Sequence, residues 1–515
     1  MKGIFLVVSV FFVTTLFASD TLLIRANDLN FVSKIDEQVF RNVMDGKPVE
    51  RFDLAMVIDT TLVDAQLQKA KTAFNQFLES LSAQNLRNKQ PEKAFKIIHE
   101  RVEDQYFKKY ELVSSFPNML NTGVYNCVSG TIVYALIFDY LGMPYEIKST
   151  TAHVYIELLT DNKKIVVEST DPLKGYYYVE PESLKKIVES LKTAKQISAA
   201  DATKSAEEVV NEYSGIKKTT FNELIGFQYF NEALKASENM LFQRSFESFQ
   251  KAYVLNPKPA TKYMLLNGIG NAIDKEKDDE KKLKMIFIYM RLNPDFDQDI
   301  IAQVYEHLLD KNCIQKDNTA LMESFEPNIQ SDISDSTFRA KLSYLHYFIL
   351  GANAYYKHDK QKTFSLLNKA YGFNKENLQL KAMLEEVTMK LFASYAEAEH
   401  YDSLGYVLRM ITESEIKIEN PYIDELYDFI IVGKYFKGKN ATAVENMLPS
   451  IIEEVKHDKH VLSVEESTAF LYSELANSFY REHNYAKSKL YLKKAMTLAP
   501  DNSDFKAKYN QIKDY

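Results

Sequence analysis

A repeated helical pattern constrains this chain more than any other feature of its sequence. Near the C-terminus, large and small residues recur at spacings that place them on the facing sides of two successive helices. The eight positions are Tyr472, Leu475, Ala476, Phe479, Ser488, Leu492, Ala495 and Pro500. Small residues let two antiparallel helices approach, and large ones fill the space between neighbouring pairs. Such a pair cannot bury its apolar face alone, so the pattern predicts stacked helical hairpins over 221–515.

Two weaker copies of the pattern stand earlier in the chain. One comprises Tyr347, Leu350, Gly351, Leu367 and Ala370, and the other comprises Tyr229, Ala233, Phe249, Ala252 and Pro257. Together the three copies resemble the tetratricopeptide repeat, a helical hairpin of about 34 residues. The resemblance implies an all-α solenoid that binds protein or peptide partners.

The composition agrees with long helices and excludes several classes of function. The 515 residues include only 15 glycines and 13 prolines against 33 tyrosines and 32 phenylalanines, which disfavours a many-stranded sandwich or barrel. With a net charge of −8, no nucleic-acid partner is expected. The two cysteines are too few for a disulfide framework or a four-thiolate site, and no glycine-rich phosphate loop occurs. We therefore expect neither a metal nor a cofactor.

The first 19 residues have the layout of a secretory signal peptide. Lys2 precedes an apolar run over 4–17, and Ala18-Ser19-Asp20 follows it. The run is shorter than the ~20 residues that cross a bilayer comfortably, although an uncleaved membrane anchor is the alternative. We expect an exported protein, periplasmic or extracellular, whose contact with a membrane is at most peripheral.

The region 20–180 lacks the repeated helical pattern and combines expected helices with expected strands. Its expected helices are 65–81, 91–110 and 128–141, and its expected strands are 145–148, 153–159 and 165–168. Helices followed by strands indicate an α+β domain with a helical N-terminal segment. We expect a helical connector over 181–220 between this domain and the all-α repeats, and a fragment 20–215 that folds without them.

Cys127 and His153 are the residues best suited to chemistry. Cys127 stands at the expected start of a helix, where free N–H groups stabilise a thiolate, and His153 on the next strand could serve as its base. A two-residue turn at Asp161-Asn162 would place Glu168 diagonally from His153, whereas a three-residue loop would place Asp171 opposite it. Glu168 is preferred. Two plainer interpretations of Cys127 are a small buried side chain and a disulfide with Cys313.

These residues carry a resemblance to the transglutaminase-like superfamily, whose members share a papain-like core. The matching segments are Gly123-Val124-Tyr125-Asn126-Cys127-Val128-Ser129-Gly130, Leu141-Gly142-Met143-Pro144-Tyr145, Ala152-His153-Val154-Tyr155 and Glu168-Ser169-Thr170. The resemblance covers roughly 90–180, with Glu in the place of the usual Asp. It implies that Cys127 is the nucleophile, that His153 is the general base and then acid, and that Glu168 or Asp171 orients the imidazole.

The sequence thus predicts an exported cysteine-dependent acyl-transfer enzyme with a repeat array that binds protein or peptide partners. Its reaction could be that of a protease, an amidase or a transglutaminase, because these share every step until water or an amine resolves the acyl-enzyme. The alternative is a non-catalytic interaction scaffold with an inactive transglutaminase-like domain.

Overall fold

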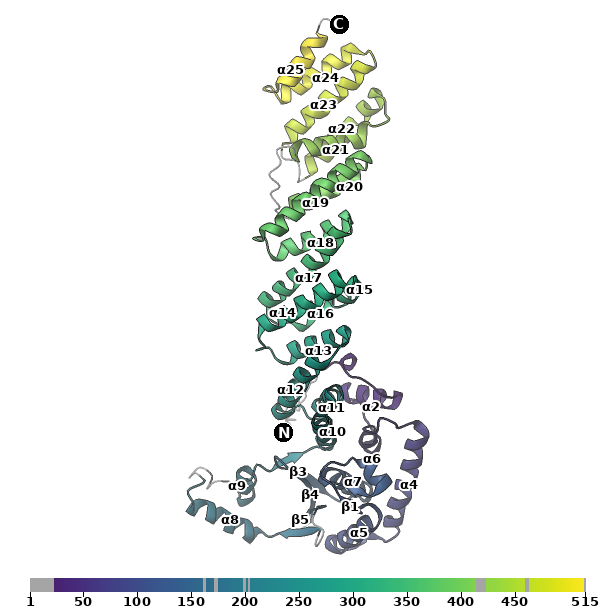
Figure 1. Cartoon of the computed structure of the whole chain (residues 1–515), viewed down its shortest axis with the longest axis vertical. Coiled ribbons are helices and arrows are strands. Elements are labelled where there is room, and N and C mark those ends of the chain that lie inside the picture. Colours follow the sequence, from purple (N-terminus) through teal and green to yellow (C-terminus); the bar gives the residue numbers. More distant parts are fainter. Residues whose placement is uncertain are drawn as a thin grey trace, which may run out of the picture. The chain divides into compact units, whose positions relative to one another are not determined.

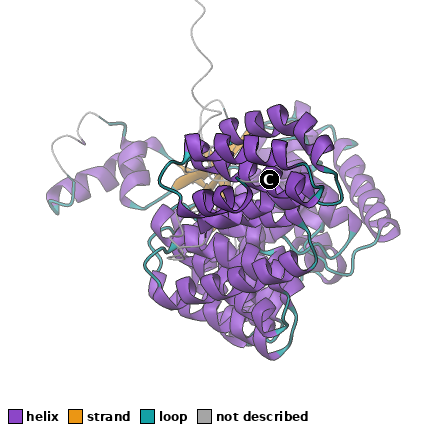
Figure 2. Ribbon diagram, turned by 90° about the horizontal axis from the view of Figure 1, so that it is seen from above, coloured by secondary structure: helices purple, strands orange, loops and turns teal. Residues whose placement is uncertain are grey.

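The computed structural model describes residues 23–160, 164–170, 175–197, 201, 204–413, 423–458 and 463–513. The predicted signal peptide therefore lies outside the described residues. The described chain is mostly helical, with a small antiparallel sheet (Figures 1 and 2). It forms two compact units, which divide between Phe296 and Asp297. No helix in the described ranges is both long and apolar enough to cross a bilayer.

The first unit combines helices with all the described strands. Its helices before the sheet are α2 (Lys34–Met44), α3 (Arg51–Met56), α4 (Asp64–Ser82), α5 (Pro91–Tyr106), α6 (Phe116–Thr122) and α7 (Cys127–Leu141). Its strands are β1 (Lys109–Tyr110), β2 (Val124–Tyr125), β3 (Tyr145–Ser149), β4 (Val154–Leu159), β5 (Lys164–Val167), β6 (Tyr176–Val179) and β7 (Lys217–Thr219). Its later helices are α8 (Pro181–Thr193), α9 (Ala206–Tyr213), α10 (Phe221–Glu238), α11 (Phe242–Leu255), α12 (Pro259–Lys275) and α13 (Asp279–Leu292).

The main sheet is antiparallel throughout, with the strand order β6-β5-β4-β3-β7. Ile156 pairs with Val167 and Glu157 with Val166, so the same register carries Tyr155 opposite Glu168. This is the register expected for a two-residue turn, although residues 161–163 of the turn itself are outside the described ranges. Asp171, the alternative partner of His153, lies outside the described residues.

Two strands of the main sheet were not expected from the sequence. β6 extends the sheet beyond β5, and β7 pairs with β3 from within the segment expected to be a helical connector. β7 is short and polar, and its Thr219 shares a 2.7 Å hydrogen bond with the hydroxyl of Ser149. A two-stranded parallel pair, β1 and β2, also replaces the end of the helix expected over 91–110.

Helix α7 forms the centre of the first unit. Its residues from Ile132 to Ala135 are fully buried, as the continuous apolar run predicts. Asn126 caps its start and Gly142, with φ of +66°, ends it in the left-handed conformation. Thr131 Oγ1 donates to the Val154 carbonyl at 3.3 Å, which ties α7 to β4.

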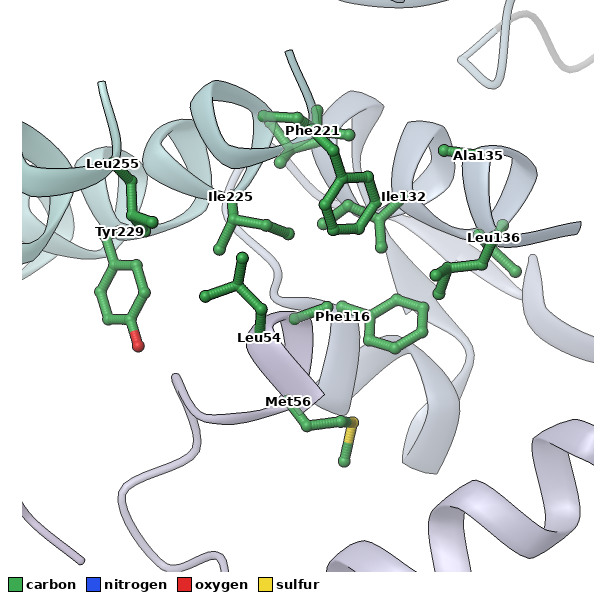
Figure 3. Packing of buried hydrophobic residues seen from close by; sticks show 14 of the residues in the cluster. Leu54, Met56, Phe116, Ile132, Ala135, Leu136, Phe221, Ile225, Tyr229 and Leu255 are labelled. Atoms are coloured by element: carbon green, nitrogen blue, oxygen red, sulfur yellow. The ribbon is translucent and has the colours of Figure 1, made fainter. Parts of the chain in front are cut away.

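Helix α10 belongs to the same core as α7. Phe221, Ile225 and Tyr229 of α10 lie in one buried cluster with Leu54 and Ile132 (Figure 3). This core continues to Leu292 of α13, so the compact unit extends past the boundary expected near residue 221. The physical reason is the apolar face of α10, which the first unit buries.

A polar side chain also joins α10 to the elements before the sheet. Gln228 accepts a 2.6 Å hydrogen bond from the Phe116 backbone N–H and donates to the Ala55 carbonyl at 3.1 Å. Because Gln228 is buried, these two bonds satisfy its amide and fix its position.

The second unit consists of helices. They are α14 (Gln298–Leu309), a π-helical turn (Asp310–Gln315), α15 (Thr319–Ser324), α16 (Glu326–Asp332), α17 (Ser336–Tyr356), α18 (Lys360–Phe373), α19 (Leu378–Glu397), α20 (Tyr401–Glu413), α21 (Ile423–Phe436), α22 (Ala441–His457), α23 (Val464–Arg481), α24 (Tyr485–Leu498) and α25 (Ser503–Ile512).

The expected hairpins are present in both units, as α10/α11, α17/α18 and α23/α24. In each, a residue with φ near +60° stands between the two helices: Met240, His358 or His483. Ser245 Oγ donates to the Ala233 carbonyl and Ser488 Oγ to the Ala476 carbonyl, both at 2.9 Å. These shared details identify one recurring helical hairpin, as the spacing of large and small residues predicts.

Candidate active site

Cys127 is the first residue of α7. Asn126 Oδ1 accepts a hydrogen bond from the Ser129 N–H at 2.9 Å, and Ser129 Oγ accepts one from the Asn126 N–H at 3.0 Å. This reciprocal cap fixes the start of the helix at Cys127. Cys127 is a half-buried, free thiol.

His153 ends the tight connection between β3 and β4. The Thr150 N–H donates to the His153 carbonyl at 2.8 Å, and the His153 N–H donates to Thr150 Oγ1 at 3.1 Å. Its ring stacks beside that of Tyr155, with centroids 6.1 Å apart. The backbone bonds and the ring contact together limit how far the imidazole can turn.

The Glu168 carboxylate is hydrogen-bonded to the imidazole of His153. His153 Nε2 and Glu168 Oε2 are 2.7 Å apart, and Glu168 Oε1 accepts bonds from the Thr170 hydroxyl at 2.6 Å and the Thr170 N–H at 3.2 Å. Burial raises the pKa of Glu168, but the hydrogen bonds from His153 and Thr170 outweigh it and lower that pKa overall. Glu168 is therefore an ionised carboxylate at neutral pH.

The hydrogen bonds to Cys127 and then to Glu168 raise the pKa of His153 to about 10, against the opposing effect of burial. The structure thus places both Cys127 and Glu168 near one imidazole, and the raised pKa keeps that imidazole protonated at neutral pH. Such an arrangement can activate a nucleophile and deliver a proton.

The sequence also singled out Asp171 and Cys313. Asp171 is outside the described residues. Cys313 is buried at the π-helical turn, burial raises its pKa to about 12, and both cysteines are free rather than bridged. In the described part of the chain, no group of three His, Cys, Asp or Glu side chains is arranged to hold a metal.

Sequence reasoning missed the role of Gly130, one turn after Cys127. A Cβ on Gly130 would lie 2.6 Å from both Cβ and Oγ of Ser169, the neighbour of Glu168. Only a residue without a side chain lets the end of β5 approach α7 this closely. A glycine inside an apolar helix was the available signal, because it usually marks a packing constraint.

Comparisons with known proteins add little to this description. No family model matches the chain, and no curated protein matches it. Among solved structures, a chain in "Structure of Naa15/Naa10 bound to HypK-THB" is similar at 11% identity, over 64% of this chain and 65% of that chain, with a TM-score of 0.14. This chain thus spans less than two thirds of that one, and so low a TM-score carries no argument. No comparison supports the transglutaminase-like resemblance, which rests on the residues quoted above.

Proposed function

We propose that the first unit is a cysteine-dependent acyl-transfer enzyme of the transglutaminase-like type, acting on amide or peptide bonds. The observation that supports the proposal is the 2.7 Å hydrogen bond between His153 Nε2 and the Glu168 carboxylate, in a histidine whose pKa is raised by Cys127 and by Glu168. A half-buried carboxylate, an imidazole and a thiol are the components of a nucleophilic triad.

Each group has a defined role in the proposed reaction. The Cys127 thiolate attacks the carbonyl carbon of an amide, and the C–N bond breaks as the His153 imidazolium gives its proton to the leaving amine. The neutral imidazole then takes a proton from water or a second amine as that molecule attacks the thioester. The Cys127–carbon bond breaks, which regenerates the thiolate and the imidazolium. Glu168 stabilises the imidazolium and fixes its orientation throughout.

We further propose that the helical repeats bind a protein or peptide partner, and that the protein acts after export to the periplasm or the cell exterior. A cavity of about 420 Å³ between α18, α19 and α20 supports the first point, with Phe364, Tyr395 and Tyr406 among its lining residues. The apolar stretch over 4–17 supports the second.

A second candidate function is a non-catalytic interaction scaffold. The observation that favours it is the extent of the repeats, which begin with α10 in the first unit and occupy the second unit. In that case Cys127 would be an unactivated thiol, and the only function would be the binding of a partner by the repeats.

Alkylation of Cys127 by iodoacetamide separates the two candidates. The rate is measured at pH 6 and pH 8 by mass spectrometry of the Cys127 peptide, with glutathione as the reference thiol. The enzyme proposal expects Cys127 to react roughly tenfold faster than glutathione at pH 6, because the imidazolium sustains a thiolate there. The buried Cys313 is no reference, since burial alone keeps it slow.

His153→Gln and Glu168→Gln are the informative variants. At pH 6, His153→Gln is expected to alkylate at Cys127 no faster than glutathione, and Glu168→Gln is expected to lose part of its rate advantage over glutathione. His457→Gln is the matched control, because that histidine lies exposed at the end of α22. A Cys127 that reacts like glutathione at both pH values, with or without His153, would refute the enzyme proposal in favour of the scaffold.

A further inference from the structure

The segment between β1 and α6 carries an exposed apolar residue whose backbone is hydrogen-bonded to the residue before Cys127. Leu112 is 80% exposed, yet its carbonyl accepts a 3.2 Å hydrogen bond from Asn126 Nδ2. Asn126 is the residue that caps α7 and directly precedes Cys127. One buried amide therefore fixes both the start of the nucleophile's helix and the position of Leu112.

Further hydrogen bonds hold this segment in place. The Glu111 N–H donates to the Tyr125 carbonyl at 2.9 Å, and Ser114 Oγ donates to the Val124 carbonyl at 2.6 Å. A loop held in this way does not lose conformational freedom when a ligand binds, so an apolar contact with it contributes its full effect to affinity.

Tyr110 ends β1 directly before this segment and pairs with Tyr125 of β2, two residues before Cys127. It is 43% exposed, and its ring stands edge-on to Tyr125 with centroids 5.7 Å apart. Partial burial and the negative charges of Cys127 and Glu168 raise the pKa of Tyr110, so the phenol is near both groups and stays protonated at neutral pH. Two exposed side chains, Tyr110 and Leu112, are thus fixed by contacts with Tyr125 and Asn126, the two residues before Cys127.

We propose that Tyr110 and Leu112 form a subsite for a large apolar side chain next to the reactive acyl group, so that the substrates are peptides or proteins with such a residue at the reacting bond. The inference rests on the proposed function and goes beyond it by naming the substrate class. Covering Leu112 and the Tyr110 ring removes apolar surface from water, which favours a bulky side chain over glycine.

A pair of peptide electrophiles tests the subsite in the full-length protein. Benzyloxycarbonyl-phenylalanyl chloromethyl ketone and its glycyl analogue carry the same warhead and differ in the side chain beside it. The ratio of their rates of reaction with Cys127 is the readout, after each is divided by the rate with the same reagent and glutathione. The wild-type ratio is expected to be roughly ten or more.

Leu112→Ser and Tyr110→Ser are each expected to bring that ratio toward one. Leu112→Ser is safe for folding because its side chain is solvent-exposed, and Leu378→Ser, at 81% exposure in the second unit, is the matched control with an unchanged ratio. The subsite is overturned if the wild-type ratio is near one, or if the ratio is unchanged in both Leu112→Ser and Tyr110→Ser. Neither result affects the triad, which the iodoacetamide experiment tests separately. If iodoacetamide labels Cys127 at the same rate in the wild type and in His153→Gln, both the triad and the subsite are overturned.

Discussion

Gly130 of α7 and Ser169 after β5 lie so close that a Cβ on Gly130 would be 2.6 Å from Ser169 Cβ. Ser169 is buried and adjoins Glu168, whose carboxylate holds His153. The separation between helix and strand at this point therefore determines where the Glu168 carboxylate lies. The position of Glu168 depends on the absence of a side chain at Gly130.

We expect Gly130→Ala to slow alkylation of Cys127 at pH 6 and to lower the free energy of unfolding by about 1–3 kcal/mol, because the added methyl pushes Ser169 away. The rate and the urea midpoint measure the two effects. Gly130→Ala combined with Ser169→Gly should recover both. Gly270→Ala in α12 has open space around its Cβ and should stabilise by roughly 0.5–1 kcal/mol. A wild-type rate in Gly130→Ala would contradict this account.

Glu168→Gln should lower the pKa of His153 from its value of about 10, because the second largest contribution to that pKa is removed. The midpoint of the ring-proton shift in an NMR titration measures the change. Activity on any amide or ester substrate should fall by a factor on the order of 10²–10⁴. An unchanged His153 midpoint in Glu168→Gln would show that the carboxylate does not act on the ring.

The raised pKa of His153 also makes stability depend on pH. The folded protein binds the proton more tightly than the unfolded chain, whose histidine has a pKa of 6.5. The resulting stabilisation is complete below pH 6.5 and is lost as the pH rises through about 10. Urea unfolding of the wild type and of His153→Gln should therefore show a difference that narrows across this window. A difference in unfolding free energy that widens as the pH rises would contradict a raised pKa of His153.

The packing of α10 on α7 predicts which fragments fold. A fragment 23–296 should unfold cooperatively, whereas 23–215 should aggregate or bind a hydrophobic dye, because removing α10 uncovers Leu54 and Ile132. Ile225→Ala in the intact chain should cost about 2–5 kcal/mol of unfolding free energy. Ile300→Ala, at an exposed position of α14, is the control with little effect. A soluble, cooperatively folded 23–215 would contradict the shared core.

A buried ion pair joins α2 to α11 and gives a further test. Lys251 Nζ and Asp36 Oδ2 are 2.6 Å apart, with 8% and 1% of the side chains exposed. Lys251→Met leaves the Asp36 carboxylate buried without its partner, so it should destabilise by about 3–5 kcal/mol. Adding Asp36→Asn removes the charge and should recover most of the loss in urea unfolding. If the double variant is no more stable than Lys251→Met alone, the unpaired Asp36 charge is not the cause of the loss.

Local sequence determined the elements whose signals lie within a few residues. Asn126 and Gly142 delimit α7, since each end of a helix is set by its own cap. The parity of a two-residue turn was enough to place Tyr155 opposite Glu168, because the side-chain period of a strand is two residues. The repeated hairpins were likewise readable from the spacing of large and small residues within single units.

Tertiary structure alone decided the relationships between distant segments. Nothing near Lys217–Thr219 indicates that it pairs with β3, and nothing within α10 indicates that its apolar face covers α7 rather than another repeat. The burial of Ser169 against Gly130 is of the same kind. A sequence pattern records that a residue needs an apolar or a close neighbour. Which neighbour it receives depends on the packing free energy of the whole core, to which residues far apart in the chain contribute together.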